Sequence, residues 1–164
     1  MTSQALPAGH SGEADAAWRQ WARALALAGP GVLDAAWREW EPKPEVQAIR
    51  GPEAGLVMMR ARTDGGGARF NLGEATVTRA TVRLHGGPLT ADAMGTAYVL
   101  GTDTAHALHA AIFQGLLADE TQRERVLTEI ITPLEREQAA RDAGRQADAQ
   151  STRVDFFSVA REHE

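Results

Sequence analysis

The spacing of hydrophobic residues changes twice along this chain, and the order of these changes limits the possible folds. Residues 13–40 place large apolar side chains at helical spacing, with Trp18 and Trp21 at i and i+3. Residues 46–100 follow the period of two that is typical of strands, and residues 103–150 return to helical spacing. This order predicts an α+β fold, an antiparallel sheet with N-terminal and C-terminal helices packed on it, rather than alternating βαβ units.

The middle region contains the clearest strand. In the segment ATVTRATVRL, Ala80, Val82 and Leu84 point to one side, while threonine and arginine side chains point to the other. This alternation predicts a half-buried strand in a sheet with one polar face. The turn sequences GPEAG, TDGGG and HGGPLTADAMG separate the strand candidates, which are residues 46–50, 55–62, 68–72, 75–84 and 96–100.

Two helices are predicted before the strands. The segment Gly29, Pro30 and Gly31 separates a helix over residues 13–28 from a shorter helix over residues 31–40. All four tryptophans of the chain lie in these two helices. At this spacing we expect the tryptophans in a core or an interface rather than stacked on nucleobases.

Three further helices are predicted after the strands. Asp103 is the expected N-cap of the first. The second covers residues 119–131, and Thr132 with Pro133 starts a third that ends near residue 150, because a capping residue followed by proline is typical of a helix start. The third helix has few large apolar residues, so we expect it to lie in solvent or against a partner.

Length and composition fit one domain and exclude several classes of protein. The 164 residues suffice for one hydrophobic core, so we expect a flexible arm over residues 1–12 and a single domain over residues 13–164, with residues 151–164 as an interface tail.

The formal net charge of -5 argues against nucleic acid as a partner. The lack of cysteine excludes disulfides and thiolate-held metals. With no signal-like or membrane-spanning apolar segment, we expect a cytoplasmic protein without a membrane partner.

Arginine supplies nearly all of the positive charge of this chain. Arg60 and Arg62 share one face of a predicted strand, and Arg79 and Arg83 share one face of another. If these faces align, the sheet presents a guanidinium cluster suited to phosphate, phosphonate or an acidic protein surface. The alternative is an ordinary solvated face with scattered acidic neighbours.

The other motifs give little support for a catalytic centre. His106 and His109 lie three residues apart on a predicted helix, but no third ligand follows at a fitting spacing, so no metal site is predicted. The segment DGGGARF lacks the lysine and the spacing of a phosphate-binding loop, and no serine lies in a nucleophile motif. Phe156 and Phe157 lie close to the end of the chain, and we expect them to anchor in a pocket, because exposed phenylalanines reduce solubility.

Three uncommon segments stand in a characteristic order: AIRGPEAGLVMMRARTDGGGARFNLGEATVTRATVRL, GTAYVLGTDTAHALHAAI and TRVDFFSVAR. Together with the opening helix they resemble the G subunit of the bacterial carbon-phosphorus lyase core complex, the PhnG family, over residues 15–161. Within the domain, the resemblance rests on Gly73, Glu74, Thr76, Thr78, Gly101, Asp103 and His106.

The resemblance implies an accessory subunit of a phosphonate-degrading complex, without an active site of its own. In that family the G subunit, with the H and I subunits and an associated ATP-binding-cassette-like protein, supports a transferase step. In this step methylphosphonate displaces adenine from ATP and gives ribose 1-methylphosphonate 5-triphosphate. The iron-sulfur cluster and S-adenosylmethionine of the pathway belong to the J subunit. The resemblance thus implies the H, I and J subunits as partners, ATP and methylphosphonate as substrates of the complex, and no cofactor in this chain.

Two hypotheses about the functional residues follow. The first is that the tail forms an interface with partner subunits through Arg153, Val154, Asp155, Phe156, Phe157 and Arg161. The rival is an independent phosphonate- or nucleotide-binding enzyme whose anion site is formed by Arg60, Arg62, Arg79 and Arg83.

Overall fold

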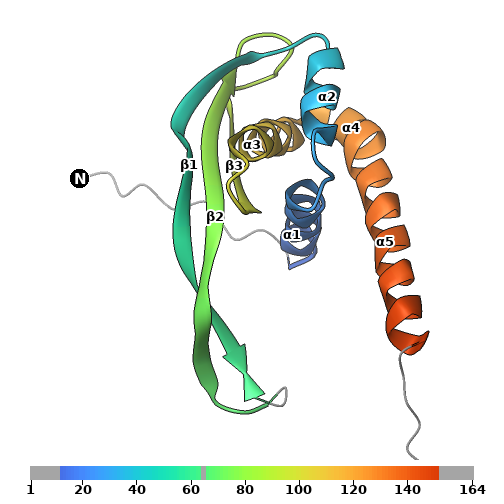
Figure 1. Cartoon of the computed structure of the whole chain (residues 1–164). Helices are drawn as coiled ribbons and strands as arrows, with labels where there is room; N and C mark the ends of the chain where they lie inside the picture. Colours follow the sequence, from blue (N-terminus) through green and yellow to red (C-terminus); the bar gives the residue numbers. More distant parts are fainter. Residues whose placement is uncertain (1–11, 64–65, 152–164) are drawn as a thin grey trace, which may run out of the picture.

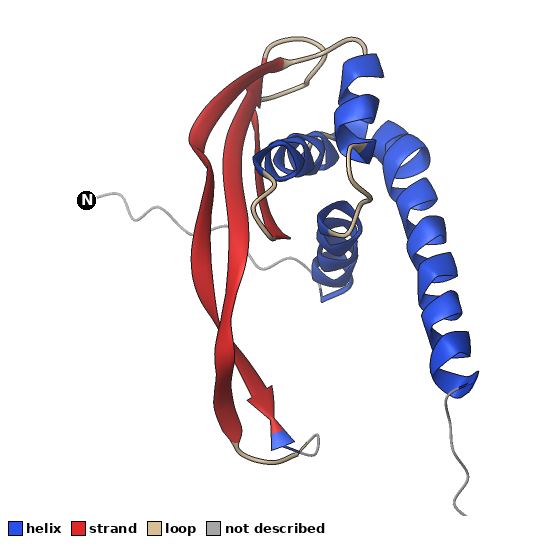
Figure 2. Ribbon diagram, in the orientation of Figure 1, coloured by secondary structure: helices blue, strands red, loops and turns tan. Residues whose placement is uncertain are grey.

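A computed structural model describes residues 12–63 and 66–151 of the chain. It contains a three-stranded antiparallel sheet in the order β1-β2-β3. The described helices all lie on one side of this sheet (Figures 1 and 2). The predicted α+β class, an antiparallel sheet with helices packed on it, is confirmed.

The elements follow the predicted order of helices, strands and helices. The helices are α1 (Gly12–Ala26), α2 (Val32–Glu39), α3 (Thr104–Ala118), α4 (Glu120–Val126), the π-helical turn η2 (Leu127–Ile131) and α5 (Thr132–Ser151). The strands are β1 (Glu45–Arg62), β2 (Arg69–His85) and β3 (Ala93–Leu100).

The strands differ in length, and part of the sheet therefore has only two strands. β1 pairs with β2 from Glu45 and His85 to Arg62 and Arg69. β3 pairs only with residues 77–84 of β2. Residues 56–62 and 69–76 thus continue as a two-stranded projection, which we call the hairpin ribbon and which extends past the helices (Figure 1).

The prediction of five separate strands is wrong, because two of the expected breaks lie inside continuous strands. The GPEAG segment is an irregularity within β1, where the register with β2 shifts on either side of Arg50. Gly51 has a φ of 68°, which accommodates the local bend at little steric cost. Pairing continues on both sides because β2 passes through without a break.

Helix α5 begins at Thr132 as predicted, but the prediction that Thr132 caps a new helix there is wrong. η2 and α5 follow α4 directly, without an intervening loop. The Thr132 hydroxyl donates to the carbonyl of Leu127 at 2.9 Å instead of capping a new helix. Pro133 has no N–H for the preceding turn, and the wider π-helical turn before it accommodates this missing donor.

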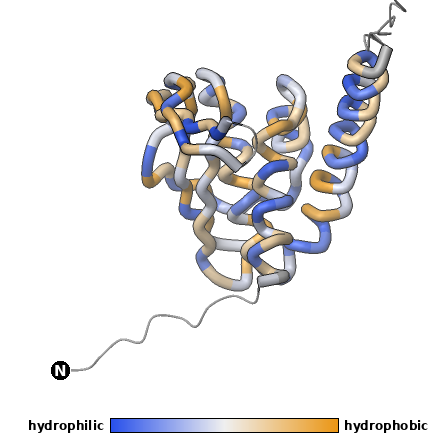
Figure 3. The backbone as a smooth tube through the Cα atoms, turned by 90° about the horizontal axis from the view of Figure 1, so that it is seen from below, coloured by the Kyte–Doolittle hydropathy of each residue, from blue (hydrophilic) through white to orange (hydrophobic). Residues whose placement is uncertain are grey.

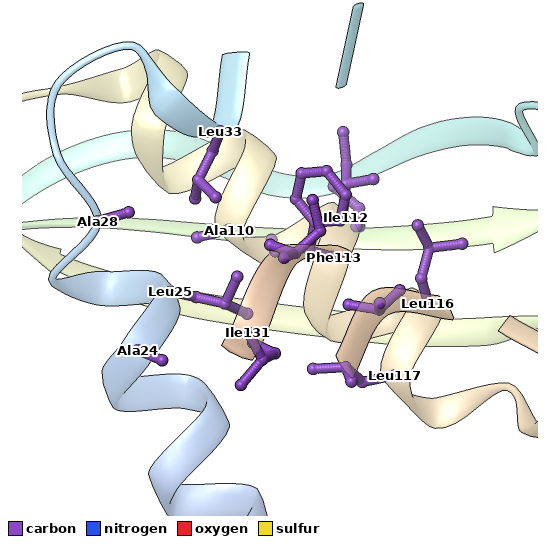
Figure 4. Packing of buried hydrophobic residues seen from close by; sticks show 14 of the residues in the cluster. Ala24, Leu25, Ala28, Leu33, Ala110, Ile112, Phe113, Leu116, Leu117 and Ile131 are labelled. Atoms are coloured by element: carbon purple, nitrogen blue, oxygen red, sulfur yellow. The ribbon is translucent and has the colours of Figure 1, made fainter. Parts of the chain in front are cut away.

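The core forms where α3 packs on the sheet. Ala80, Val82 and Leu84 of β2 are fully buried, as the alternating pattern predicts. Figure 4 shows Leu25 and Ile131 beside the side chains of α3, so α1 and η2 complete the same hydrophobic cluster. Trp40 is buried with its ring centroid 5.5 Å from that of Phe113. The other three tryptophans pack against the cluster, which confirms their predicted place in the core.

Helix α5 packs on α1 and leaves most of its surface exposed, as its composition predicts. The buried Gln138 side chain donates to the carbonyl of Ala24 at 2.8 Å. Hydrophilic residues recur along the length of α5 in Figure 3. None of the helices in the described part of the chain carries an apolar stretch long enough to cross a membrane.

Candidate functional site

The strand register separates the four arginines proposed to bind an anion. Arg79 lies opposite Glu53, whereas Arg60 lies opposite Asn71 farther along the same hairpin. Arg60 lies seven positions after Glu53 in β1, which corresponds to roughly 23 Å of strand. Arg62 lies still farther out, so the structure does not bring the four side chains into one cluster.

Arg79 and Arg83 are already paired with carboxylates. The Arg79 guanidinium donates to Glu53 at 2.6 Å, and Arg50 donates to the same carboxylate oxygen at 2.9 Å. Hydrogen bonds from Arg50 and Arg79 lower the pKa of Glu53. Arg83 forms an ion pair with Asp92. This part of the sheet therefore matches the alternative reading, a solvated face with acidic neighbours.

The arginines of the hairpin ribbon have a different environment. Arg62 pairs with Arg69 across the two strands, and Arg60 lies two residues before Arg62. Within the described residues, no hydrogen bond or ion pair engages the side chains of these three arginines. In the part of the chain that the structure describes, no carboxylate offsets their positive charge.

Most of the residues within the domain that carry the family resemblance meet where β3 ends and α3 begins. The Thr78 hydroxyl is buried and donates to the carbonyl of Gly101 at 2.7 Å. The amide of Gly101 donates to the carbonyl of Thr76 at 2.8 Å. Gly101 has a φ of 100°, a conformation that glycine adopts at little cost. These bonds hold the turn from β3 to α3 against the middle of β2.

The start of α3 extends the same network. The Asp103 carboxylate accepts from the amide of His106 at 2.9 Å, which places the predicted N-cap where it was expected. A ring nitrogen of His106 lies 2.8 Å from the carbonyl of Leu25 and so links α3 to α1. Gly73 and Glu74 are not part of this network, because they pair with Met59 and Met58 in the hairpin ribbon.

The two histidines of α3 have separate surroundings. His106 contacts α1 as described, whereas His109 is buried with Nε2 4.0 Å from a carboxylate oxygen of Asp34 in α2. Burial is the main cause that lowers the pKa of His109. Among the described residues, no group of three or more His, Asp or Glu side chains is arranged to hold a metal ion.

Two of the open hollows beside the sheet lie next to candidate residues or the core helices. One of about 460 Å³, between α1 and β3, is lined by Trp18, Leu25 and Tyr98 and has no charged side chain among its described lining residues. The other, of about 320 Å³, borders Arg79 and Glu53. A phosphate entering the second hollow would compete with the Glu53 carboxylate for the guanidinium.

The predicted interface tail cannot be located in the structure. It lies outside the described residues, as do its members Arg153, Val154, Asp155, Phe156, Phe157 and Arg161. Its role as an interface remains a prediction from the sequence.

Sequence reasoning missed the exposed apolar side chains of the hairpin ribbon. Leu56 is 65 % exposed, Met58 is 53 % exposed and Leu72 is 58 % exposed. The available signal is the string LVMM at residues 56–59, which is apolar on both faces of a strand although a half-buried strand needs only one apolar face. The ribbon is therefore a second candidate for contact with a partner.

Comparison with known proteins gives one consistent result. The family model described as "Phosphonate metabolism protein PhnG" matches residues 16–162. The protein named "Alpha-D-ribose 1-methylphosphonate 5-triphosphate synthase subunit PhnG" from Rhizobium meliloti (strain 1021) is 45% identical over 147 residues, which cover 87% of this chain and 88% of that protein. The similarity extends over the sheet and the helical layer alike.

Proposed function

Because this chain belongs to the PhnG family of phosphonate metabolism proteins, we propose that it is an accessory subunit of an α-D-ribose 1-methylphosphonate 5-triphosphate synthase. The observation that carries this proposal is the 45% identity to a named subunit of that synthase over nearly the full length of both chains. The step it supports is the displacement of adenine from ATP by methylphosphonate.

The geometry supports an accessory role. Thr78, Gly101, Asp103 and His106 belong to the residues that define the resemblance, and each makes a hydrogen bond that joins elements of the fold or caps α3. Their polar groups thus serve the architecture of the subunit. The hairpin ribbon exposes apolar side chains that are typical of surfaces covered in an assembly.

The partners of this subunit are part of the proposal. We propose the H, I and J subunits and an associated ATP-binding-cassette-like protein as its neighbours, in the cytoplasm. ATP and methylphosphonate are then substrates of the complex. The iron-sulfur cluster and S-adenosylmethionine act in the J subunit, and this chain needs no cofactor of its own.

Co-expression tests the subunit assignment directly. We expect the affinity-tagged full-length chain to purify with the H, I and J subunits in a constant ratio through a sizing column. An untagged chain in the same preparation is the control for binding to the resin. Purification of the tagged chain alone, while the other three subunits assemble without it, would contradict the assignment.

The predicted tail interface gives a sharper test. The double substitution Phe156→Ala and Phe157→Ala is expected to reduce the amount of co-purified partner at least tenfold, because aromatic anchors commonly contribute about 2 kcal/mol or more each to an interface. Leu27→Ala, at an exposed apolar residue elsewhere, is the control and should leave assembly unchanged. An undiminished complex with the double variant would rule out the tail as an anchor.

The rival hypothesis, an independent anion-binding enzyme, makes a different prediction. It requires micromolar binding of ATP or methylphosphonate by this chain alone, through Arg60, Arg62, Arg79 and Arg83. We expect titration calorimetry of the isolated chain to show no such binding, because the strand register separates these arginines and Arg79 and Arg83 are paired with carboxylates. Micromolar binding that Arg79→Gln abolishes would support the rival.

A further inference from the structure

We infer that the hairpin ribbon inserts into an apolar groove of a partner subunit whose rim carries carboxylates. This inference rests on the proposed function, because it requires that the chain works in a hetero-oligomer. It is carried by the exposure of apolar side chains on both faces of the ribbon and by three arginines at its outer end, for which the described part of the chain supplies no ion-pair partner.

The apolar residues of the ribbon lie on both of its faces. Successive side chains of a strand alternate between faces, so Leu56 and Met58 share one face while Val57 and Met59 share the other. All four are at least 41 % exposed. One exposed face is common in a soluble sheet, whereas two exposed apolar faces require cover from outside.

The opposite strand cannot supply this cover. Val57 lies across from Ala75 and Met59 lies across from Gly73, so these two large side chains face small residues of β2. The apolar surface continues toward the outer end with Phe70, which is 43 % exposed. A two-stranded hairpin is only marginally stable by itself in water, and burial in a groove would stabilise it.

The backbone of the ribbon is also available for pairing. β3 ends its pairing at residue 77 of β2, and β1 is an edge strand of the sheet. Within the described residues, both edges of the ribbon therefore lack a neighbouring strand. An exposed edge of this length can accept a strand from a partner in addition to apolar contacts.

Charge indicates which kind of partner fits. Arg60, Arg62 and Arg69 lie at the outer end of the ribbon, and Glu74 is its one acidic residue. The ribbon is therefore locally positive, whereas the chain as a whole carries a formal net charge of -5. A complementary surface has carboxylates placed around an apolar groove.

A second copy of this chain does not fit this pattern. In a two-fold symmetric contact, the same patch packs against itself. If two copies met at the outer ends of their ribbons, the arginines of the two copies would lie side by side and repel each other. If the ribbons lay side by side in opposite directions, the three arginines of one copy would meet only one ribbon carboxylate of the other, Glu74. The occupant is thus a different subunit with an acidic rim.

The inference is tested in the co-expressed complex by two pairs of variants. Leu56→Glu with Met58→Glu changes one apolar face of the ribbon, and Leu100→Glu, at a 74 % exposed residue of β3, is its control. Arg60→Glu with Arg62→Glu reverses the charge, and Arg19→Glu with Arg136→Glu is its control at exposed positions on helices. Each ribbon pair is expected to reduce co-purified partner about tenfold or more, while both controls assemble normally.

Two further measurements separate the possible failures. Thermal melting by circular dichroism should be nearly unchanged in all variants, because the altered side chains are exposed. Hydrogen exchange of residues 56–62 and 69–76 in the wild-type chain should slow at least tenfold on assembly. If the wild-type chain never assembles with the other subunits, the proposed function fails, and this inference fails with it.

Other outcomes would overturn the inference alone. If the wild-type chain and the ribbon variants assemble equally, the proposed function stands and the ribbon is not the docking element. If hydrogen exchange of the ribbon is equally slow in the isolated chain and in the complex, the terminal segments of this chain, not a partner, cover its apolar side chains. A homodimer that Leu56→Glu with Met58→Glu disrupts would assign the ribbon to a second copy.

Discussion

Replacing Gly95 by alanine is expected to lower the free energy of unfolding by about 3 kcal/mol, because overpacking against rigid main chain is costly. Gly95 lies in β3 where α3 crosses the sheet. A Cβ atom at this position would collide with the carbonyl oxygen of Ala111 and would lie 2.6 Å from the amide nitrogen of Gly115. Both are main-chain atoms of α3, so the whole helix would have to move away from the sheet.

Urea denaturation followed by tryptophan fluorescence measures this change. Gly55→Ala is a matched control, because Gly55 lies in β1 with nothing within 4 Å of the added Cβ. We expect the control to stay within about 0.5 kcal/mol of the wild-type chain. A Gly95→Ala variant as stable as the Gly55→Ala variant would contradict the close packing of α3 on β3.

Asp119→Ala is expected to cost about 3 kcal/mol at neutral pH, because it removes the charged acceptor of several partly buried hydrogen bonds and the cap of α4. The carboxylate of Asp119 is 5 % exposed and lies between α3 and α4. It accepts from the amide and hydroxyl of Thr90 at 2.8 and 2.6 Å. It also accepts from the amides of Thr121 and Gln122 at 3.0 and 3.2 Å and so caps α4.

The same residue predicts how stability changes with pH. Burial by itself raises the pKa of Asp119, but the hydrogen bonds from Thr121, Thr90 and Gln122 outweigh it and hold the pKa well below its usual range. The folded chain then binds fewer protons here than the unfolded chain, so the stabilisation is complete above the unfolded pKa of about 3.9. It is lost as the pH falls below that value toward the folded pKa.

Denaturation of the wild-type chain and the Asp119→Ala variant from pH 7 to pH 3 checks this prediction. The difference in unfolding free energy should remain constant down to about pH 5 and should shrink below about pH 4. Asp92→Ala, which removes an exposed carboxylate, is the control and should cost less than about 1 kcal/mol. A difference that stays constant down to pH 3 would show that the Asp119 carboxylate is not selectively stabilised in its charged form.

Local sequence patterns correctly predicted which side chains of a strand are buried and which residue caps a helix. The alternation in ATVTRATVRL placed Ala80, Val82 and Leu84 on the buried face, because a strand exposes its side chains with a period of two. Asp103 was predicted as an N-cap from its position before an apolar stripe, and it caps α3. These features need only neighbours in sequence.

Features that depend on tertiary pairing were predicted less well. Gly51 was assigned to a turn, but the continuous partner strand makes it a bulge within β1. Thr132 and Pro133 have the composition of a capped helix start. In the structure, however, Ile130 and Ile131 pack in the core, and the helix continues from η2 into α5 without a break. Sequence alone does not report which strand or helix lies next to a given residue.

The candidate site likewise combines features that local sequence predicts with features that depend on tertiary pairing. Face alternation correctly placed Arg79 and Arg83 on the polar face, but only the register shows that Arg60 and Arg62 lie farther along the hairpin. The exposure of Leu56 and Met58 depends on where β3 ends, and no local pattern states this. Family membership therefore indicates the function of the chain, and the structure adds the ribbon as a specific surface for a partner.

The release of adenine tests the central claim most directly. Purified H and I subunits with the associated ATP-binding-cassette-like protein are incubated with ATP and methylphosphonate, with and without this chain, and adenine is measured by liquid chromatography. We predict rapid adenine release only when this chain is present, and none from this chain alone. Equal adenine release in its absence, or release by this chain alone, would contradict its role as an accessory subunit.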